Sequence, residues 1–232
     1  MKKIVLLCFL ISILSCEKKV NFEDGIDNSL LNLAKSENPQ KTIINKDKNT
    51  IRERFDAPDN YQWVASEKNS YSNFLENFPL KKYGSPIIKF NNEKIENQNW
   101  HEAIFDVDVG EKDLQQCADA IIRLRAEYLY KAKKFDEIKF HFTSGDLCTW
   151  NDYKSGIRPK ISGNKVSFTK IVSADDSSEN FRKYLDLIFT YAGTISLFKE
   201  TEAIIDNNKL QTGDFFDHTW KSRTCGFCSW CI

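Results

Sequence analysis

The hydrophobic pattern of this chain predicts three helices. Residues 113–134 and 175–195 carry apolar side chains at helical spacing, and each segment is long enough to bury one helix face. The second of these segments opens with Asp and Ser residues that suit a helix cap. A shorter helix is expected over residues 69–78, because Pro79 cannot continue it. On the solvent side of the first helix, Asp119–Arg123 and Arg123–Glu127 are expected ion pairs at i,i+4 spacing.

Short segments between and after these helices have the composition or the alternation of strands. Residues 157–161 and 165–169 are predicted to form a hairpin around Ser162-Gly163-Asn164. The other expected strands are residues 86–90, 103–109, 138–142, 201–205 and 214–216. Strands interleaved with helices predict an α+β fold, a single domain with a mostly antiparallel sheet packed against two long helices.

The N-terminus has the pattern of a bacterial lipoprotein signal. Met1-Lys2-Lys3 is a short basic start, and residues 4–14 form an apolar run that is too short to span a bilayer as a mature helix. Ser15 is a small residue before Cys16, as in a lipobox. We expect cleavage after Ser15 and lipidation of Cys16, because several acyl chains on one residue give stable anchoring. The alternative is an ordinary secretory signal with a chance cysteine.

The composition after the signal indicates a tether followed by one domain. Residues 16–49 are rich in Lys, Asn, Asp and Ser, which is typical of a flexible linker. Residues 50–216 suit one domain with a single core. The chain has 33 basic and 33 acidic residues, and residues 1–15 contain two of the lysines. This balance argues against a nucleic-acid partner. The expected partner is a membrane of the cell envelope, reached through the lipid anchor on the periplasmic side of the outer membrane.

Cys117 lies in the first turns of the longest predicted helix, directly after the polar segment 113–116. The positive end of a helix dipole favours thiolate over thiol, so this position suits a catalytic nucleophile. Cys117 also shares a helix face with Leu114 and Ile121, which favours a small core cysteine. Both interpretations remain open for Cys117, whereas Cys148 has no evident partner and is expected to be a buried small residue.

A series of sequence blocks forms a recognisable pattern over most of the chain. They are Arg54-Phe55, Pro58, Tyr61, Phe74-Leu75, Pro79-Leu80-Lys81, Gly84-Ser85, Asn97-Gln98, residues 113–120, 123–130 and 142–145, Ser177, residues 181–185 and 191–194, and Gly213-Asp214. In this order they resemble the family of bacterial envelope proteins known as domain of unknown function 4846. The resemblance covers about residues 50–216. It implies kinship and an envelope location, and the family name implies no activity.

The C-terminal segment, residues 217–232, departs from the pattern of that family. In the family, the segment after Gly213-Asp214 resembles Gly-Ser-Pro-Gly-His-Ala-Val followed by an apolar strand. Permissible codons for residues 218–232 restore this segment when they are read one base out of frame, although Trp230 then gives glycine where aspartate is expected. We therefore expect a single-base frameshift near Phe215-Phe216. On this hypothesis residues 217–232 are out of frame, and the chain is truncated, inactive and poorly folded.

Three cysteines in the same segment offer a different interpretation. Cys225, Cys228 and Cys231 have the spacing C-x2-C-x2-C, which is typical of zinc and iron–sulfur ligands. A structural zinc site needs a fourth ligand, for which His218 is the nearest candidate. Because an unpaired thiol cluster does not suit an oxidising envelope, the metal site is only the weaker alternative. No cofactor is expected.

The order of a cysteine at a helix start and a later histidine on a strand resembles papain-like, NlpC-like and transglutaminase-like hydrolases. On this hypothesis Cys117 attacks an amide, and Gln115 or Gln116 donates to the oxyanion. The histidine partner is then encoded in the shifted frame, because His101 and His141 have the pattern of surface or half-buried structural residues. A peptide or peptidoglycan substrate would suit the compartment, and intact relatives would be amide hydrolases.

The competing hypothesis is a non-catalytic envelope lipoprotein that binds or scaffolds. It is favoured by the absence of a complete Cys-His-Asp set in the frame as given and by the aromatic content of the chain. Trp63, Trp100 and Trp150 are candidates to line a groove for carbohydrate or peptide, and packing in the core and at its rim is the alternative. Whether the protein is an enzyme remains open at this point.

Overall fold

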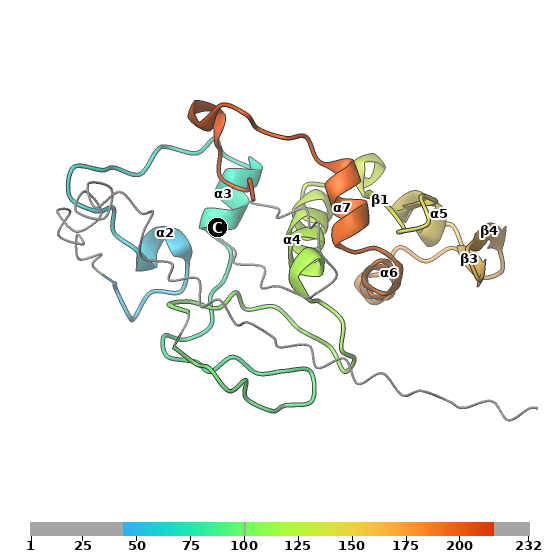
Figure 1. The fold of residues 1–232 in the computed structure, drawn as a ribbon, viewed down its shortest axis with the longest axis horizontal. Helices are drawn as coiled ribbons and strands as arrows, with labels where there is room; N and C mark the ends of the chain where they lie inside the picture. Colours follow the sequence, from blue (N-terminus) through green and yellow to red (C-terminus); the bar gives the residue numbers. More distant parts are fainter. Residues whose placement is uncertain (1–43, 100, 216–232) are drawn as a thin grey trace, which may run out of the picture. The chain divides into compact units, whose positions relative to one another are not determined.

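The computed structural model describes residues 44–99 and 101–215, which all belong to one compact unit, Thr42–Ile232. Helices and strands are mixed along this unit (Figure 1), and the α+β prediction is confirmed. The elements in chain order are α2 (Ile51–Arg54), α3 (Tyr71–Glu76), α4 (Cys117–Lys131), η1 (Phe135–Glu137), β1 (Lys139–His141), β2 (Leu147–Thr149), α5 (Trp150–Lys154), β3 (Ile157–Ser162), β4 (Lys165–Lys170), α6 (Ser178–Tyr191), α7 (Thr194–Glu200) and η2 (Asn207–Lys209).

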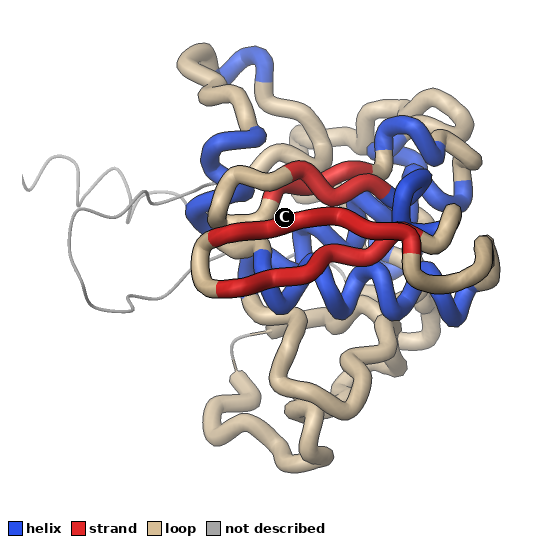
Figure 2. The backbone as a smooth tube through the Cα atoms, turned by 90° about the vertical axis from the view of Figure 1, so that its right-hand side faces the viewer, coloured by secondary structure: helices blue, strands red, loops and turns tan. Residues whose placement is uncertain are grey.

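The strands form two antiparallel pairs, drawn in red in Figure 2. In the first pair, β1 and β2 place Phe140 opposite Cys148. In the second pair, β3 and β4 run from Ile157 opposite Lys170 to Ser162 opposite Lys165. The predicted hairpin is thereby confirmed, and Gly163 at its turn has φ of 58°, a conformation that glycine adopts without strain.

Four of the strands predicted from the sequence are absent from the described residues. Residues 86–90 and 103–109 contribute isolated bridges only, Ile88 with Lys94 and Phe105 with Leu80. Residues 201–205 form no strand, and neither do 214 and 215, the described part of the last expected strand. A strand needs a neighbour that pairs over several residues, and residues 86–90 and 103–109 each pair at one position only.

The three predicted helices are present with shifted ends. α4 begins at Cys117 rather than at residue 113, because Gln115 has φ of 64°, which no helix residue adopts. α6 begins after Ser177, whose hydroxyl accepts a hydrogen bond from the Asn180 N–H at 3.2 Å, so its predicted cap is confirmed. α6 ends at Tyr191, and α7 follows as a separate helix.

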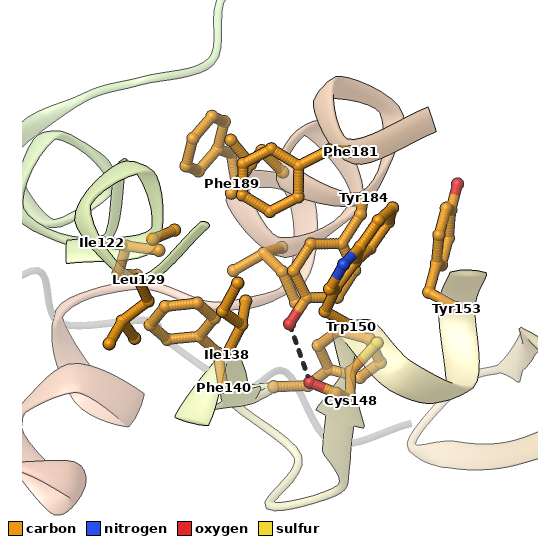
Figure 3. Packing of buried hydrophobic residues seen from close by; sticks show 14 of the residues in the cluster. Ile122, Leu129, Ile138, Phe140, Cys148, Trp150, Tyr153, Phe181, Tyr184 and Phe189 are labelled. Carbon is orange, nitrogen blue, oxygen red and sulfur yellow. Dashed lines mark hydrogen bonds between the residues drawn. The ribbon is translucent and has the colours of Figure 1, made fainter. Parts of the chain in front are cut away.

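The core lies between the long helices and the β1–β2 pair, and aromatic side chains dominate it (Figure 3). The Trp150 ring centroid lies 5.1 Å from that of Phe181 and 5.6 Å from that of Tyr184. The Tyr184 hydroxyl donates to the Cys148 carbonyl at 3.0 Å, the dashed line in Figure 3. Trp150 is fully buried, so the core interpretation of this residue is confirmed and a binding role at an open groove is excluded for it.

Candidate functional site

Cys117 is the first residue of the 15-residue helix α4 and is partly exposed. Its predicted place at a helix start is confirmed, and it is not a fully buried core residue. Cys148 is 3% exposed, and burial raises the pKa of its thiol to about 12. The prediction that Cys148 is a small buried residue is confirmed. Both cysteines are free thiols, and they differ in access to solvent.

The two glutamines before Cys117 have different environments. The Gln115 side-chain amide donates to the Asp108 carbonyl at 2.9 Å, and its oxygen accepts from Arg123 Nη1 at 3.1 Å. These contacts hold Gln115 in its left-handed conformation and commit its side chain to the structure. Gln116 is exposed. Of the two proposed oxyanion donors, Gln116 is therefore the one with a solvent-facing side chain.

Asp119 and Arg123 do not lie on the solvent side of α4, contrary to the simple helical pattern. Each is 8% exposed. The expected pair of Arg123 with Glu127 is present at 2.7 Å. Asp119 turns instead to the helix start, where its Oδ2 accepts the Gln116 N–H at 3.0 Å. Its Oδ1 has no hydrogen-bond partner among the described residues, and burial raises the pKa of Asp119 to about 6.

Neither described histidine hydrogen-bonds the Cys117 thiol. His141 Nδ1 lies 2.6 Å from Glu200 Oε1, which joins β1 to α7. His101 Nε2 lies 3.2 Å from the Ser85 carbonyl. The described residues therefore contain no Cys–His pair, and no group of three His, Cys, Asp or Glu side chains there could hold a metal ion. The other predicted site residues, Cys16, His218, Cys225, Cys228 and Cys231, lie outside the described residues.

A cavity of about 210 Å³ lies in the segment between α3 and α4, next to the end of α2. Charged, amide and imidazole side chains line this cavity at Arg54, Lys82, Lys94, Gln98, His101 and Glu102. Three of these residues are cationic, Arg54, Lys82 and Lys94, and one, Glu102, is a carboxylate. Lys82, Lys94 and Glu102 are exposed, whereas Arg54 is 1% exposed. The cavity is thus basic, with its most buried charge at Arg54.

Arg54 is fixed by two hydrogen bonds and retains an unused donor. Its Nε donates to the Lys48 carbonyl at 2.7 Å, and its Nη2 donates to the Lys81 carbonyl at 2.9 Å. Its Nη1 is buried and has no hydrogen-bond partner among the described residues. An unpaired buried donor on a charged group is costly, so this nitrogen is complementary to an acceptor that enters the cavity.

His101 presents a second unused atom at the same cavity. A carbonyl oxygen only accepts hydrogen bonds, so the contact with Ser85 places the ring proton on Nε2. His101 Nδ1 is buried and has no hydrogen-bond partner within the described chain. The ring is half-buried, as predicted, and it lines the cavity.

Gln98 stabilises the wall of the cavity. Its Oε1 accepts the Ile87 N–H at 2.8 Å, and its Nε2 donates to the carbonyls of Ile95 and Ile87 at 2.8 and 3.2 Å. These three bonds close the segment around the single bridge between Ile88 and Lys94. The side-chain amide of Gln98 is therefore used within the protein, whereas Arg54 and His101 each retain a buried atom without a partner among the described residues.

A second depression, of about 480 Å³, lies along α4 and α6. Its charges are largely paired, Arg123 with Glu127 at 2.7 Å and Arg182 with Asp108 and Asp186 at 3.5 and 3.3 Å. Cys117 is not among the lining residues of this depression or of the cavity at Arg54. Because its charges neutralise one another, the second depression is less suited to a charged ligand than the Arg54 cavity.

The sequence interpretation missed the Arg54 cavity. Arg54, Gly84-Ser85 and Gln98 each belong to blocks that carry the family resemblance, and all of them line this cavity. The available signal was an arginine between the apolar residues Ile51 and Phe55, together with polar blocks spread over about fifty residues. No periodicity joins such positions, so their meeting is visible only in the fold.

The described residues thus form an α+β domain that contains a basic cavity and a long helix whose first residue is a cysteine. No helix among them has the length and apolar character needed to cross a membrane. The family model described as "Domain of unknown function (4846)" matches residues 51–224, and the chain belongs to this family. No curated protein and no solved structure matches the chain.

Proposed function

We propose that this chain is a non-catalytic envelope lipoprotein, anchored through Cys16, whose domain binds a small anionic ligand in the Arg54 cavity. The observation that supports binding is the buried Nη1 of Arg54, which has no partner among the described residues. The anchor rests on the sequence pattern of residues 1–16. The absence of a Cys–His pair among the described residues favours this function over amide hydrolysis.

The geometry of Arg54 favours anion binding in three ways. Its guanidinium is already held by Lys48 and Lys81, so little side-chain entropy is lost when a ligand binds. Its burial lowers the local dielectric and strengthens a charge-assisted hydrogen bond. Lys82 and Lys94 at the exposed rim add positive charge that attracts an anion to the opening.

Binding is tested by titrating the full chain with acetate, phosphate and sulfate. We expect saturable binding of at least one anion to the wild type, and a rise of the Kd by roughly tenfold in Arg54→Lys. Lysine keeps the charge, but it cannot hold two carbonyls and still present a donor to the ligand. The matched control is Arg52→Lys on the same helix, because Arg52 lies over the Trp63 ring at 5.0 Å and not in the cavity.

A second matched pair tests the exposed rim. Lys94→Gln removes a charge that lines the cavity and is expected to raise the Kd by about two- to fivefold, as for other exposed charge contacts. Lys89→Gln removes a charge that pairs with Glu93 at 3.5 Å outside the cavity and is expected to leave the Kd unchanged. No saturable binding of any of the three anions to the wild type, or equal losses within both pairs, would contradict the proposed function.

The anchor is tested by metabolic labelling with a fatty acid and by fractionation of the host cells. Cys16→Ser is expected to abolish the label and to release the chain from the membrane fraction, because the lipid has no attachment point. Cys8→Ser is the matched control, since Cys8 lies inside the apolar run and has no role in lipidation on this hypothesis. An unchanged label in Cys16→Ser would exclude the anchor at this residue.

A Cys117 hydrolase is the second candidate function, and it is favoured by the partly exposed thiol at the first residue of α4. This function requires a reactive thiolate. On the hydrolase hypothesis, alkylation by iodoacetamide near neutral pH modifies Cys117 faster than a model thiol, and Cys148 reacts only after unfolding. Peptide mapping by mass spectrometry separates the two sites, with Cys148 as the internal control. Slow modification of Cys117 in the native chain would exclude a catalytic thiolate.

A further inference from the structure

Two residues that line the Arg54 cavity each carry a buried atom without a hydrogen-bond partner among the described residues, and the two atoms differ in hydrogen-bonding character. Arg54 Nη1 is a donor that lacks an acceptor among the described residues. His101 Nδ1 lacks a partner as well, and it is an acceptor whenever the ring is neutral, since the Ser85 carbonyl holds the ring proton on Nε2. A ligand that satisfies both atoms must bring an anionic acceptor and a hydrogen-bond donor together.

We propose that the ligand of this cavity is a carboxylate whose α position carries a hydrogen-bond donor. The carboxylate accepts from Arg54 Nη1, and the α N–H or O–H donates to His101 Nδ1. This inference rests on the proposed anion-binding function and names the ligand class for the same cavity. The shared chemistry is found at the C-terminus of a peptide, where the donor is an amide N–H, and in an α-hydroxy acid, where it is a hydroxyl.

The size and lining of the cavity agree with a group of this kind. A volume of about 210 Å³ corresponds to about seven water molecules at liquid density, which is enough for one terminal residue. Pro86, Ala103 and Ile104 line the cavity as well and provide apolar surface for a small side chain. Gly84 contributes backbone to the wall, and a Cβ at this position would meet no atom within 4 Å, so the wall is open on that side.

A simple carboxylate pairs with Arg54 and leaves His101 Nδ1 without a partner. Acetate or propionate accepts from Arg54 but leaves His101 Nδ1 buried and unpaired, which carries the penalty of an unsatisfied polar group. A site built to pair with a donor discriminates strongly against an analogue that lacks the donor, because its own polar atom is left unpaired. Affinity is therefore expected to depend on the α donor as well as on the charge.

The test compares lactate with propionate, which differ by one hydroxyl, and adds N-acetylalanine as the mimic of a peptide end. In the wild-type chain we expect lactate, N-acetylalanine or both to bind at least about fivefold more tightly than propionate. The stronger of the two ligands identifies the source, a hydroxy acid or a peptide C-terminus.

Two variants separate this inference from anion binding itself. His101→Phe keeps an aromatic ring and removes the acceptor. In this variant lactate, N-acetylalanine and propionate are expected to bind with about the same Kd. Arg54→Lys is expected to raise the Kd of all three ligands by a similar factor. Equal binding of lactate, N-acetylalanine and propionate to the wild type would overturn the α-donor inference and leave the anion site standing. Absence of binding by every anion would overturn the proposed function instead.

Discussion

Replacing Trp150 with alanine is expected to lower the free energy of unfolding by about 3–5 kcal/mol, the largest single effect that the core predicts. Trp150 is fully buried, and its ring contacts side chains from two helices, Tyr130 on α4 and Phe181 and Tyr184 on α6. Truncation at Cβ removes these contacts and leaves a large cavity between rigid elements, so the surroundings relax only in part.

Urea denaturation followed by circular dichroism measures this loss. Trp63→Ala is the matched control, because Trp63 is 37% exposed and donates a single hydrogen bond to the Phe55 carbonyl at 3.0 Å. Its expected cost is about 1 kcal/mol. A loss at Trp150 no greater than that at Trp63 would mean that the helices and the β1–β2 pair do not share one core.

Local signals in the sequence were sufficient for the parts of the fold that depend on neighbouring residues. The hairpin of β3 and β4 follows from two alternating runs around one glycine, and α6 follows from its apolar stripe and the Ser177 cap. The same stripe continues to Ile195, so the predicted helix was longer than α6, which ends at Tyr191. Ala192 is extended and Gly193 opens a new helix, so Ile195 is 60% exposed on α7 instead of being buried on α6.

Features that depend on distant residues were not visible in the pattern. The isolated bridge at Ile88 looks like a strand in sequence, but its segment is held by the side chain of Gln98 instead of by a neighbouring strand. Arg54 is buried because carbonyls at Lys48 and Lys81 happen to meet its guanidinium. A charged residue with such partners has no signature in hydrophobic periodicity.

The candidate site shows the same division. The place of Cys117 at the start of α4 was predicted, because a helix start depends on local sequence. The buried position of Asp119 was not, since i,i+4 spacing alone suggested an exposed pair with Arg123. The capping bond to the Gln116 N–H draws the Asp119 carboxylate towards the helix start instead.

This burial makes Asp119 the source of the second large effect. Its pKa is raised from 3.8 to about 6 in the folded chain, and burial is the main cause. The folded state therefore binds more protons than the unfolded state between these two values. The contribution of Asp119 to the stability is therefore highest below about pH 4, falls as the pH rises to about 6, and remains lower above it, by about 3 kcal/mol for a shift of this size.

Asp119→Asn should remove this loss, because the amide oxygen can still accept the Gln116 N–H while no charge is buried. At pH 7 to 8 the variant is expected to be more stable than the wild type by about 2 kcal/mol, after allowance for the lost favourable contact of a charge with the helix dipole. The difference should shrink as the pH falls to about 4. Chemical denaturation of both chains from about pH 4 to 8 measures the two stability curves.

Asp175→Asn is the control with the opposite sign. The exposed Asp175 carboxylate accepts the Ser177 N–H at 2.9 Å, and hydrogen bonding to Ser177 lowers its pKa. Its charged form is favoured in the folded chain, so Asp175→Asn should give no gain at neutral pH. Parallel stability curves for the wild type and Asp119→Asn across this range would show that the Asp119 carboxylate is solvated in the native chain, and the buried cap at the start of α4 would have to be abandoned.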